Sequence, residues 1–111
     1  MKYQETQIGN ILVVKVLESR ITADVASRFK ADMVDYVKAG HHNLILDLSD
    51  VSFIDSSGLG ALIATLKVIG KDGEIVIAAA PPTVVVMFEL TRMDRVFRLI
   101  KSVDEAVSSF S

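Results

Sequence analysis

The chain has no cysteine and only two histidines, and these shortages exclude several classes of site. Without cysteine it can form no disulfide and offer no thiolate to a metal. His41 and His42 follow a predicted helix end, and a metal site there would need further ligands at suitable spacing. We therefore interpret both as exposed loop histidines and expect neither a metal nor a cofactor.

Long apolar runs and clustered charge are also missing. The longest apolar tract, residues 75–88, is interrupted by Pro81 and Pro82, and each part is too short to cross a bilayer. The opening residues 1–7 lack the apolar core of a signal peptide. The 12 Lys and Arg residues are scattered along the chain, and the net charge is −2. The sequence therefore lacks the cluster of basic residues that binding to nucleic acid requires. We expect a cytosolic protein without direct nucleic-acid contact or membrane insertion.

Apolar residues, by contrast, are abundant. The 111 residues suffice for one domain with a single core, which we place at residues 1–111. Half of the residues are hydrophobic, so part of the apolar surface is expected to contact a partner. This surplus would suit a homodimer as well as a hetero-complex.

The pattern of apolar residues predicts an α/β fold. Residues 3–8 and 11–17 flank a Gly-Asn step and predict an antiparallel hairpin. Residues 44–48 form a near-continuous apolar run, typical of a strand buried on both faces. We expect a mixed, mostly parallel five-stranded sheet with about four helices. The remaining predicted elements are strands at residues 74–79 and 96–100, and helices at residues 23–38, from about 56 to 69, from about 81 to 91, and 102–109.

Caps support three of these helices. Thr22 is the candidate cap of the first helix, and either Asp55 or Ser56 could cap the second. Ser102 with Glu105 forms a capping box for the last helix. In the first helix, Asp24, Arg28 and Asp32 are spaced four apart, and we interpret them as a solvated outer face. Val25, Phe29, Met33, Tyr36 and Val37 form its predicted core stripe.

The junction between the central strand and the second helix is the candidate functional site. Its sequence is Asp55-Ser56-Ser57-Gly58-Leu59-Gly60. Gly58 and Gly60 lack Cβ atoms, so another molecule could approach the backbone closely. A phosphate on a hydroxyl here would face the positive end of the helix dipole, an interaction of roughly 0.3–1 kcal/mol.

This junction resembles the signature of the anti-sigma factor antagonists of the STAS domain family. The segments 73–77, 87–94 and 102–106 are also similar to that family in order and spacing. The resemblance implies a small α/β domain that binds a serine kinase doubling as an anti-sigma factor. It also implies that the kinase phosphorylates the serine directly after the aspartate, which is Ser56, with Ser57 as the fallback.

One loop departs from the family pattern. Related proteins often have Gly-x-Leu-Asp before the first helix, whereas this chain has Ser19-Arg-Ile-Thr22, and its nearest acid is Asp24. The departure leaves open whether the partner is the usual kinase or another protein. We therefore do not assign to Thr22 the role that the aspartate has in the family.

The leading hypothesis is a non-enzymatic, phosphorylation-switched binding module that releases a sigma factor by binding its anti-sigma factor. Residues 55–60 would contact the kinase, and a serine phosphatase would be a further partner. One alternative is a STAS module outside sigma control, either a signalling-complex scaffold or a cytosolic component of a lipid transporter. The other alternative is a small nucleotide hydrolase, which has less support because the sequence contains no nucleophile elbow, dinucleotide fingerprint or P-loop.

Overall fold

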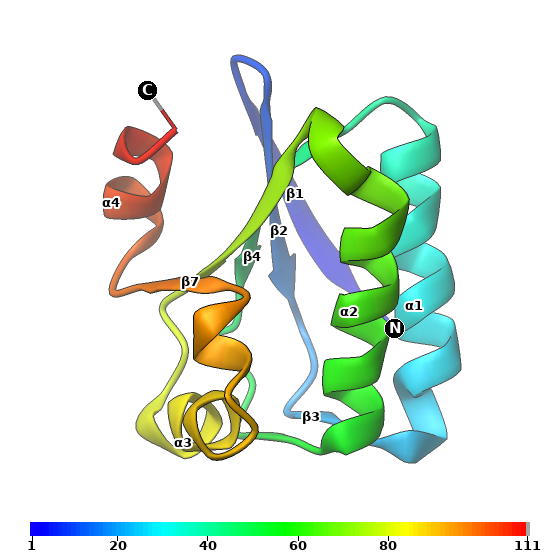
Figure 1. The fold of residues 1–111 in the computed structure, drawn as a ribbon, viewed down its shortest axis with the longest axis vertical. Helices are drawn as coiled ribbons and strands as arrows, with labels where there is room; N and C mark the ends of the chain where they lie inside the picture. Colours follow the sequence, from blue (N-terminus) through cyan, green and yellow to red (C-terminus); the bar gives the residue numbers. More distant parts are fainter. Residues whose placement is uncertain (111) are drawn as a thin grey trace.

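The computed structural model of the protein describes residues 1–110, which are arranged around a five-stranded sheet (Figure 1). The strand order is β1-β2-β4-β6-β7; the first pair is antiparallel and the other pairs are parallel. The predicted mixed sheet with its N-terminal hairpin and four helices is confirmed. The strands are β1 (Tyr3–Ile8), β2 (Ile11–Val16), β4 (Asn43–Asp47), β6 (Glu74–Ala78) and β7 (Arg98–Ile100).

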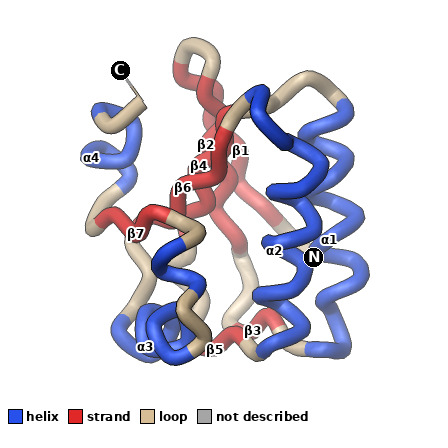
Figure 2. Tube along the Cα trace, in the orientation of Figure 1, coloured by secondary structure: helices blue, strands red, loops and turns tan. Residues whose placement is uncertain are grey.

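Helices cover the two faces of this sheet unequally (Figures 1 and 2). On one face α1 and α2 lie side by side, while the short α4 lies on the other. Successive residues of β4 point to opposite faces: Leu44 and Leu46 belong to the core beneath α1 and α2, and Ile45 to the one beneath α4. The helices are α1 (Ala23–Lys38), α2 (Ser56–Ile69), α3 (Pro82–Leu90) and α4 (Val103–Ser108).

A second, two-stranded sheet was not predicted. β3 (Arg20–Ile21) pairs in parallel with β5 (Phe53–Ile54), and the Arg20 guanidinium lies 4.9 Å from the centroid of the Phe53 ring. Strands of two residues are too short to show a period in the sequence. The pairing matters because β3 leads into α1 and β5 into α2, so both helices begin at the same end of the molecule (Figure 1).

One predicted boundary needs correction. The last strand begins at Arg98 rather than at Val96, because residues 93–95 form a 3-10 turn, η2 (Met93–Arg95). Between α2 and β6, Gly70–Asp72 forms a second 3-10 helix, η1. The third helix forms despite its β-branched residues, because Val84 and Phe88 are both fully buried on one side of it.

All five residues of the predicted core stripe of the first helix lie in or against the core, but they are buried to different degrees. Phe29, Met33 and Val37 are buried, whereas Val25 and Tyr36 are only half-buried. Asp32 is not simply solvated: it accepts a hydrogen bond from the Tyr3 hydroxyl at 2.6 Å. The predicted cap at the other end of the chain is present, since the Ser102 hydroxyl accepts from the Glu105 N–H at 3.1 Å.

Neither a membrane helix nor a metal cluster is found between residues 1 and 110. No helix in this range has the length and apolar character that spanning a bilayer requires. The same range has no group of three His, Asp or Glu side chains placed to hold a metal ion. The His41 ring packs edge-on against Tyr36, and the His42 carbonyl accepts from the Glu74 N–H at 3.0 Å.

Candidate functional site

Asp55 determines how the second helix begins. It has an extended backbone (φ −104°, ψ −176°), and its Oδ1 accepts a hydrogen bond from the Gly58 N–H at 3.0 Å. Its carbonyl accepts from the Leu59 N–H, also at 3.0 Å. Of the two candidate caps for α2, the structure therefore selects Asp55. The hydroxyl of Ser56 is not used for capping, and its side chain is exposed.

The same carboxylate also caps the first helix. Oδ2 of Asp55 accepts from the Ala23 N–H at 3.0 Å, which joins residues 32 apart in the chain. Thr22, the predicted cap, forms no capping hydrogen bond, and its hydroxyl instead donates to the Asp24 carboxylate. One side chain thus satisfies an N–H at the start of each helix and fixes the two starts together. No local sequence pattern could indicate this bond, because its partners come from distant segments.

Gly58 is required by contacts within the chain. A Cβ atom at Gly58 would lie 2.6 Å from the Ile21 carbonyl oxygen and 2.7 Å from Cγ1 of Ile54. Gly58 and Leu59 are both buried, so they support the junction from below. The close approach that the missing Cβ of Gly58 permits within the chain is that of β3.

Ser56, Ser57 and Gly60 form the exposed side of this turn. The two serines border different hollows, because adjacent residues of a helix point about 100° apart. Ser56 borders an apolar hollow of about 230 Å³ between α2 and η2, which we call the Ser56 hollow. Its other lining residues are Leu59, Gly60, Ile63, Thr91 and Met93.

Ser57 instead borders the groove between α1 and α2, which we call the Ser57 groove. This groove has a volume of about 310 Å³, and most of its lining residues are small. Lys30 is the one charged residue that lines it. The other lining residues are Ala23, Ala26, Ser27, Gly60, Ala61 and Ala64.

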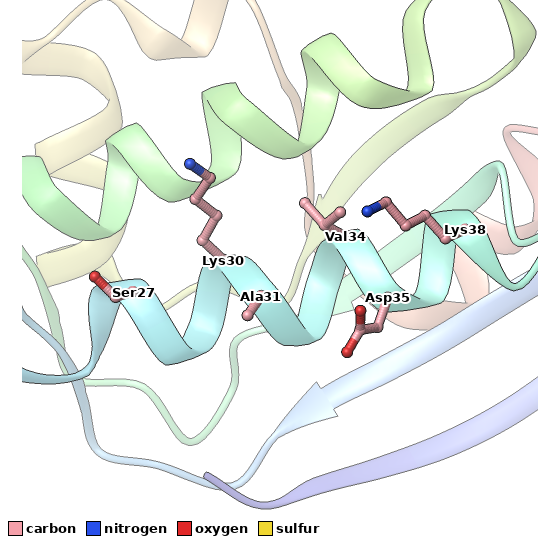
Figure 3. Close-up of a pocket in the computed structure, with 6 residues that line it drawn as sticks. All are labelled: Ser27, Lys30, Ala31, Val34, Asp35 and Lys38. Atoms are coloured by element: carbon pink, nitrogen blue, oxygen red, sulfur yellow. The ribbon is translucent and has the colours of Figure 1, made fainter.

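A further hollow of about 400 Å³ lies along α1 (Figure 3). Lys30 and Val34 point from α1 toward α2, Lys38 runs along α1 toward Val34, and Asp35 points away from α2. Lys30 is common to this hollow and to the Ser57 groove.

The edge strand β1 is fixed to α1 by two tyrosines. The Tyr3 hydroxyl donates to Asp32 and the Tyr36 hydroxyl donates to Glu5, each at 2.6 Å. Burial raises the pKa of both tyrosines, and the hydrogen bonds to the carboxylates raise it further. Arg28 pairs with Asp32 at 3.5 Å. This arrangement lies at the outer edge of the sheet and joins two elements, so we regard it as structural.

Residues 19–22, where the sequence differs from the family pattern, contain β3. The Ser19 carbonyl accepts from the backbone N–H of Ser52 at 2.8 Å and from its hydroxyl at 3.0 Å. The Ile21 carbonyl accepts from the Asp55 N–H at 3.2 Å. The segment is therefore bonded through its backbone to the strand that precedes the site.

Comparison with known proteins gives a consistent result. The family model described as "STAS domain" matches residues 2–106. A Thermotoga maritima protein named "Putative anti-sigma factor antagonist" is 29% identical over 103 residues, covering 91% of each chain. The crystal structure of an anti-sigma factor antagonist from Mycobacterium paratuberculosis superimposes with a TM-score of 0.87 at 27% identity, covering 97% of this chain and 92% of that one.

More distant structures share the fold alone. The anti-sigma factor antagonist SpoIIAA in its unphosphorylated form has a TM-score of 0.80 at 17% identity, covering 98% of this chain and 96% of its own. SpoIIAA has also been solved in a phosphorylated form. A sulfate transporter family protein from Wolinella succinogenes has a TM-score of 0.78 at 16% identity, covering 94% of this chain and 87% of that one. The fold by itself therefore does not distinguish an anti-sigma factor antagonist from a domain of a transporter family protein.

Proposed function

Because the chain belongs to the STAS domain family, we propose that it is an anti-sigma factor antagonist switched by phosphorylation of Ser56. In this proposal residues 1–111 act as a single non-enzymatic module. The unphosphorylated form binds an anti-sigma factor serine kinase and thereby frees the sigma factor. A serine phosphatase restores that form, and the exchange takes place in the cytoplasm.

The observation that carries this proposal is an exposed hydroxyl on a firmly held turn. Ser56 is exposed although its neighbour Asp55 is bonded to both helix starts and Gly58 is packed against β3. A kinase can therefore reach the hydroxyl without displacing the core. In this proposal the partner contacts the turn formed by residues 55–60, in which Ser56, Ser57 and Gly60 are exposed and Asp55 is half-buried. Leu59 supports it as part of the lining of the Ser56 hollow.

The switch follows from where the new charge would lie. A phosphoryl group on Ser56 adds about −1.5 to −2 charges at neutral pH. The start of α2 tolerates this charge, but the Ser56 hollow has no cation among its lining residues. A partner that packs against the neutral hydroxyl would meet new bulk and an unpaired dianion. Losing about 3–4 kcal/mol at such an interface lowers the affinity by roughly two to three decades.

Two measurements test the proposal. Incubation with ATP and the cognate anti-sigma kinase, followed by peptide mass spectrometry, is expected to place phosphate on Ser56. Ser56→Ala is expected to abolish that phosphate, while Ser57→Ala serves as the matched control. Phosphate that persists at full yield in Ser56→Ala would refute the site.

The second measurement concerns affinity. The chain with phosphoserine at position 56 is expected to bind the kinase two to three decades more weakly than the unmodified chain, by calorimetry. Ser56→Ala is expected to bind as the unmodified chain does, because it brings no charge. Equal affinities for the phosphorylated and unmodified chains would contradict the switch.

A further inference from the structure

The large sheet ends on one side at β1, whose outer edge pairs with no other strand between residues 1 and 110. The Leu17 N–H donates to the Lys2 carbonyl at 2.9 Å, so the even-numbered residues of this segment form the hydrogen-bonded pairs with β2. Backbone groups alternate in direction along an antiparallel strand. The N–H and C=O groups of Tyr3, Glu5 and Gln7 therefore point outward, away from the sheet.

This edge lacks the features with which proteins usually prevent strands from joining. All six residues of β1 pair with β2 in one uninterrupted register, without a bulge, and the strand contains no proline or lysine. Its one charged side chain, Glu5, accepts from the Tyr36 hydroxyl at 2.6 Å. The Gln7 side chain donates to the Gly9 and Ile11 carbonyls of its own hairpin. Both side chains are thus bonded within the chain, and the backbone edge stays open.

We propose that β1 is an interaction surface for a second copy of this chain, which adds its own β1 in antiparallel direction. The two sheets then form one continuous sheet about a two-fold axis. Thr6 of one copy lies opposite Thr6 of the other on this axis. The outward groups of Glu5 bond to those of Gln7 in the second copy, so the two Glu5 carboxylates do not face each other. This surface is separate from the proposed phosphorylation site.

Ile8 favours a second copy over another protein as the occupant. Its side chain is apolar yet 40% exposed. Even-numbered residues of β1 border a hollow of about 300 Å³ on the α4 side of the sheet, which we call the α4-side hollow. Its lining includes Gln4, Thr6, Val13 and Val103. In the proposed register, Ile8 of the second copy lies opposite Gln4, at the rim of this hollow. Each copy therefore carries both the exposed apolar side chain and the hollow beside which it packs.

The proposed dimer leaves the candidate phosphorylation site open. No residue of β1 lines the Ser56 hollow or the Ser57 groove. Each dimer would therefore present two accessible Ser56 turns. A partner that is itself two-fold symmetric could bind both turns at once, and its overall affinity would then exceed that for a single chain.

Because the chain has no cysteine, disulfide cross-linking gives a clean test of the register. The Thr6 pair is of the non-hydrogen-bonded kind, with Cα atoms about 4.5 Å apart, which suits a disulfide. Two copies of Ile8→Cys would instead hold their sulfurs about 13 Å apart along the strands. Under mild oxidation, Thr6→Cys is expected to form a linked dimer at least about tenfold faster than Ile8→Cys. Mixing Ile8→Cys with Gln4→Cys is expected to restore linkage. Equal rates for Thr6→Cys and Ile8→Cys would overturn the inference.

Sedimentation equilibrium tests the association without a covalent bond. An interface along one strand edge is small, so the unmodified chain is expected to dimerise at concentrations on the order of 0.1–1 mM. Thr6→Lys places two like charges at the axis and is expected to lower the association constant about fivefold. An equimolar mixture of Thr6→Lys and Thr6→Glu is expected to recover it. Ser27→Lys is the control, because Ser27 is exposed and lines the groove toward α2.

Two results of this measurement would overturn the inference. One is an unmodified chain that stays monomeric over the whole range, and the edge would then be free for an extended segment of another protein. The other is a Thr6→Lys chain that dimerises as tightly as the unmodified chain, which would place the contact on another surface. Circular dichroism of each variant checks that the fold is kept, and Thr6 is suited to substitution because it is exposed.

Discussion

The first turn of α2 has an inner side and an outer side that differ in hydrogen bonding, packing and exposure. On the inner side, Asp55 bonds to the starts of two helices and Gly58 has backbone and side-chain atoms within 3 Å of the place of a Cβ. On the outer side, Ser56 and Ser57 are exposed, and a Cβ at Gly60 would meet nothing within 4 Å. One short sequence therefore combines a packed, hydrogen-bonded support with two exposed serine hydroxyls.

The largest effect is expected from filling the inner side. Gly58→Ala places a methyl group against the Ile21 carbonyl, so β3 or α2 must shift. We expect a loss of about 2–3 kcal/mol in the free energy of unfolding, measured by urea denaturation. The better helix propensity of alanine offsets less than half of this loss. A stability equal to that of the unmodified chain would show that the inner side is not tightly packed.

The second prediction removes the shared cap. Asp55→Ala leaves the Gly58 and Ala23 N–H groups without their acceptor. We expect a loss of about 1–2 kcal/mol, and hydrogen exchange that is faster at the start of α1 as well as at the start of α2. Thr22→Ala is the control, because the Thr22 hydroxyl does not cap α1. If exchange changes only in α2, the bond to Ala23 contributes nothing to α1.

These inner contacts also show how far the sequence predicts the site. The strand, the helix, the capping role of Asp55 or Ser56 and the exposure of the serines follow from local pattern. The bond from Asp55 to Ala23 and the packing of Gly58 against Ile21 do not, because both depend on β3 lying beside β5. Two-residue strands have no period, and their pairing is decided by tertiary contacts alone.

The same distinction explains the corrections elsewhere in the fold. The mixed five-stranded sheet with its N-terminal hairpin and the four helices could be predicted, since each element has a long apolar pattern or a clear cap. The late start of β7 could not, because Val96 has strand propensity yet is 47% exposed after the η2 turn. The role of Asp32 depends on Tyr3, which is 29 residues away in the chain.

Filling the outer side at Gly60 is expected to have the opposite effect. Gly60→Ala adds a methyl group in open space and replaces a glycine inside a helix. We expect a gain of about 0.5–1 kcal/mol in the free energy of unfolding, opposite in sign to the effect of Gly58→Ala. The pair of variants, two residues apart, can be compared in one denaturation series. A loss of stability in Gly60→Ala would mean that the outer side is packed after all.

The smallest effect is expected at Ser56, the proposed site of phosphorylation. Ser56→Asp adds a negative charge at an exposed position in the first turn of α2, where the helix dipole favours it. The free energy of unfolding should therefore change by no more than about 0.5 kcal/mol, with Ser57→Asp as the matched control. A loss as large as that of Asp55→Ala would mean that the turn cannot hold a charge without loosening its inner contacts. Phosphorylation would then act by unfolding the turn, and the separation between a rigid inner side and a switchable outer side would be lost.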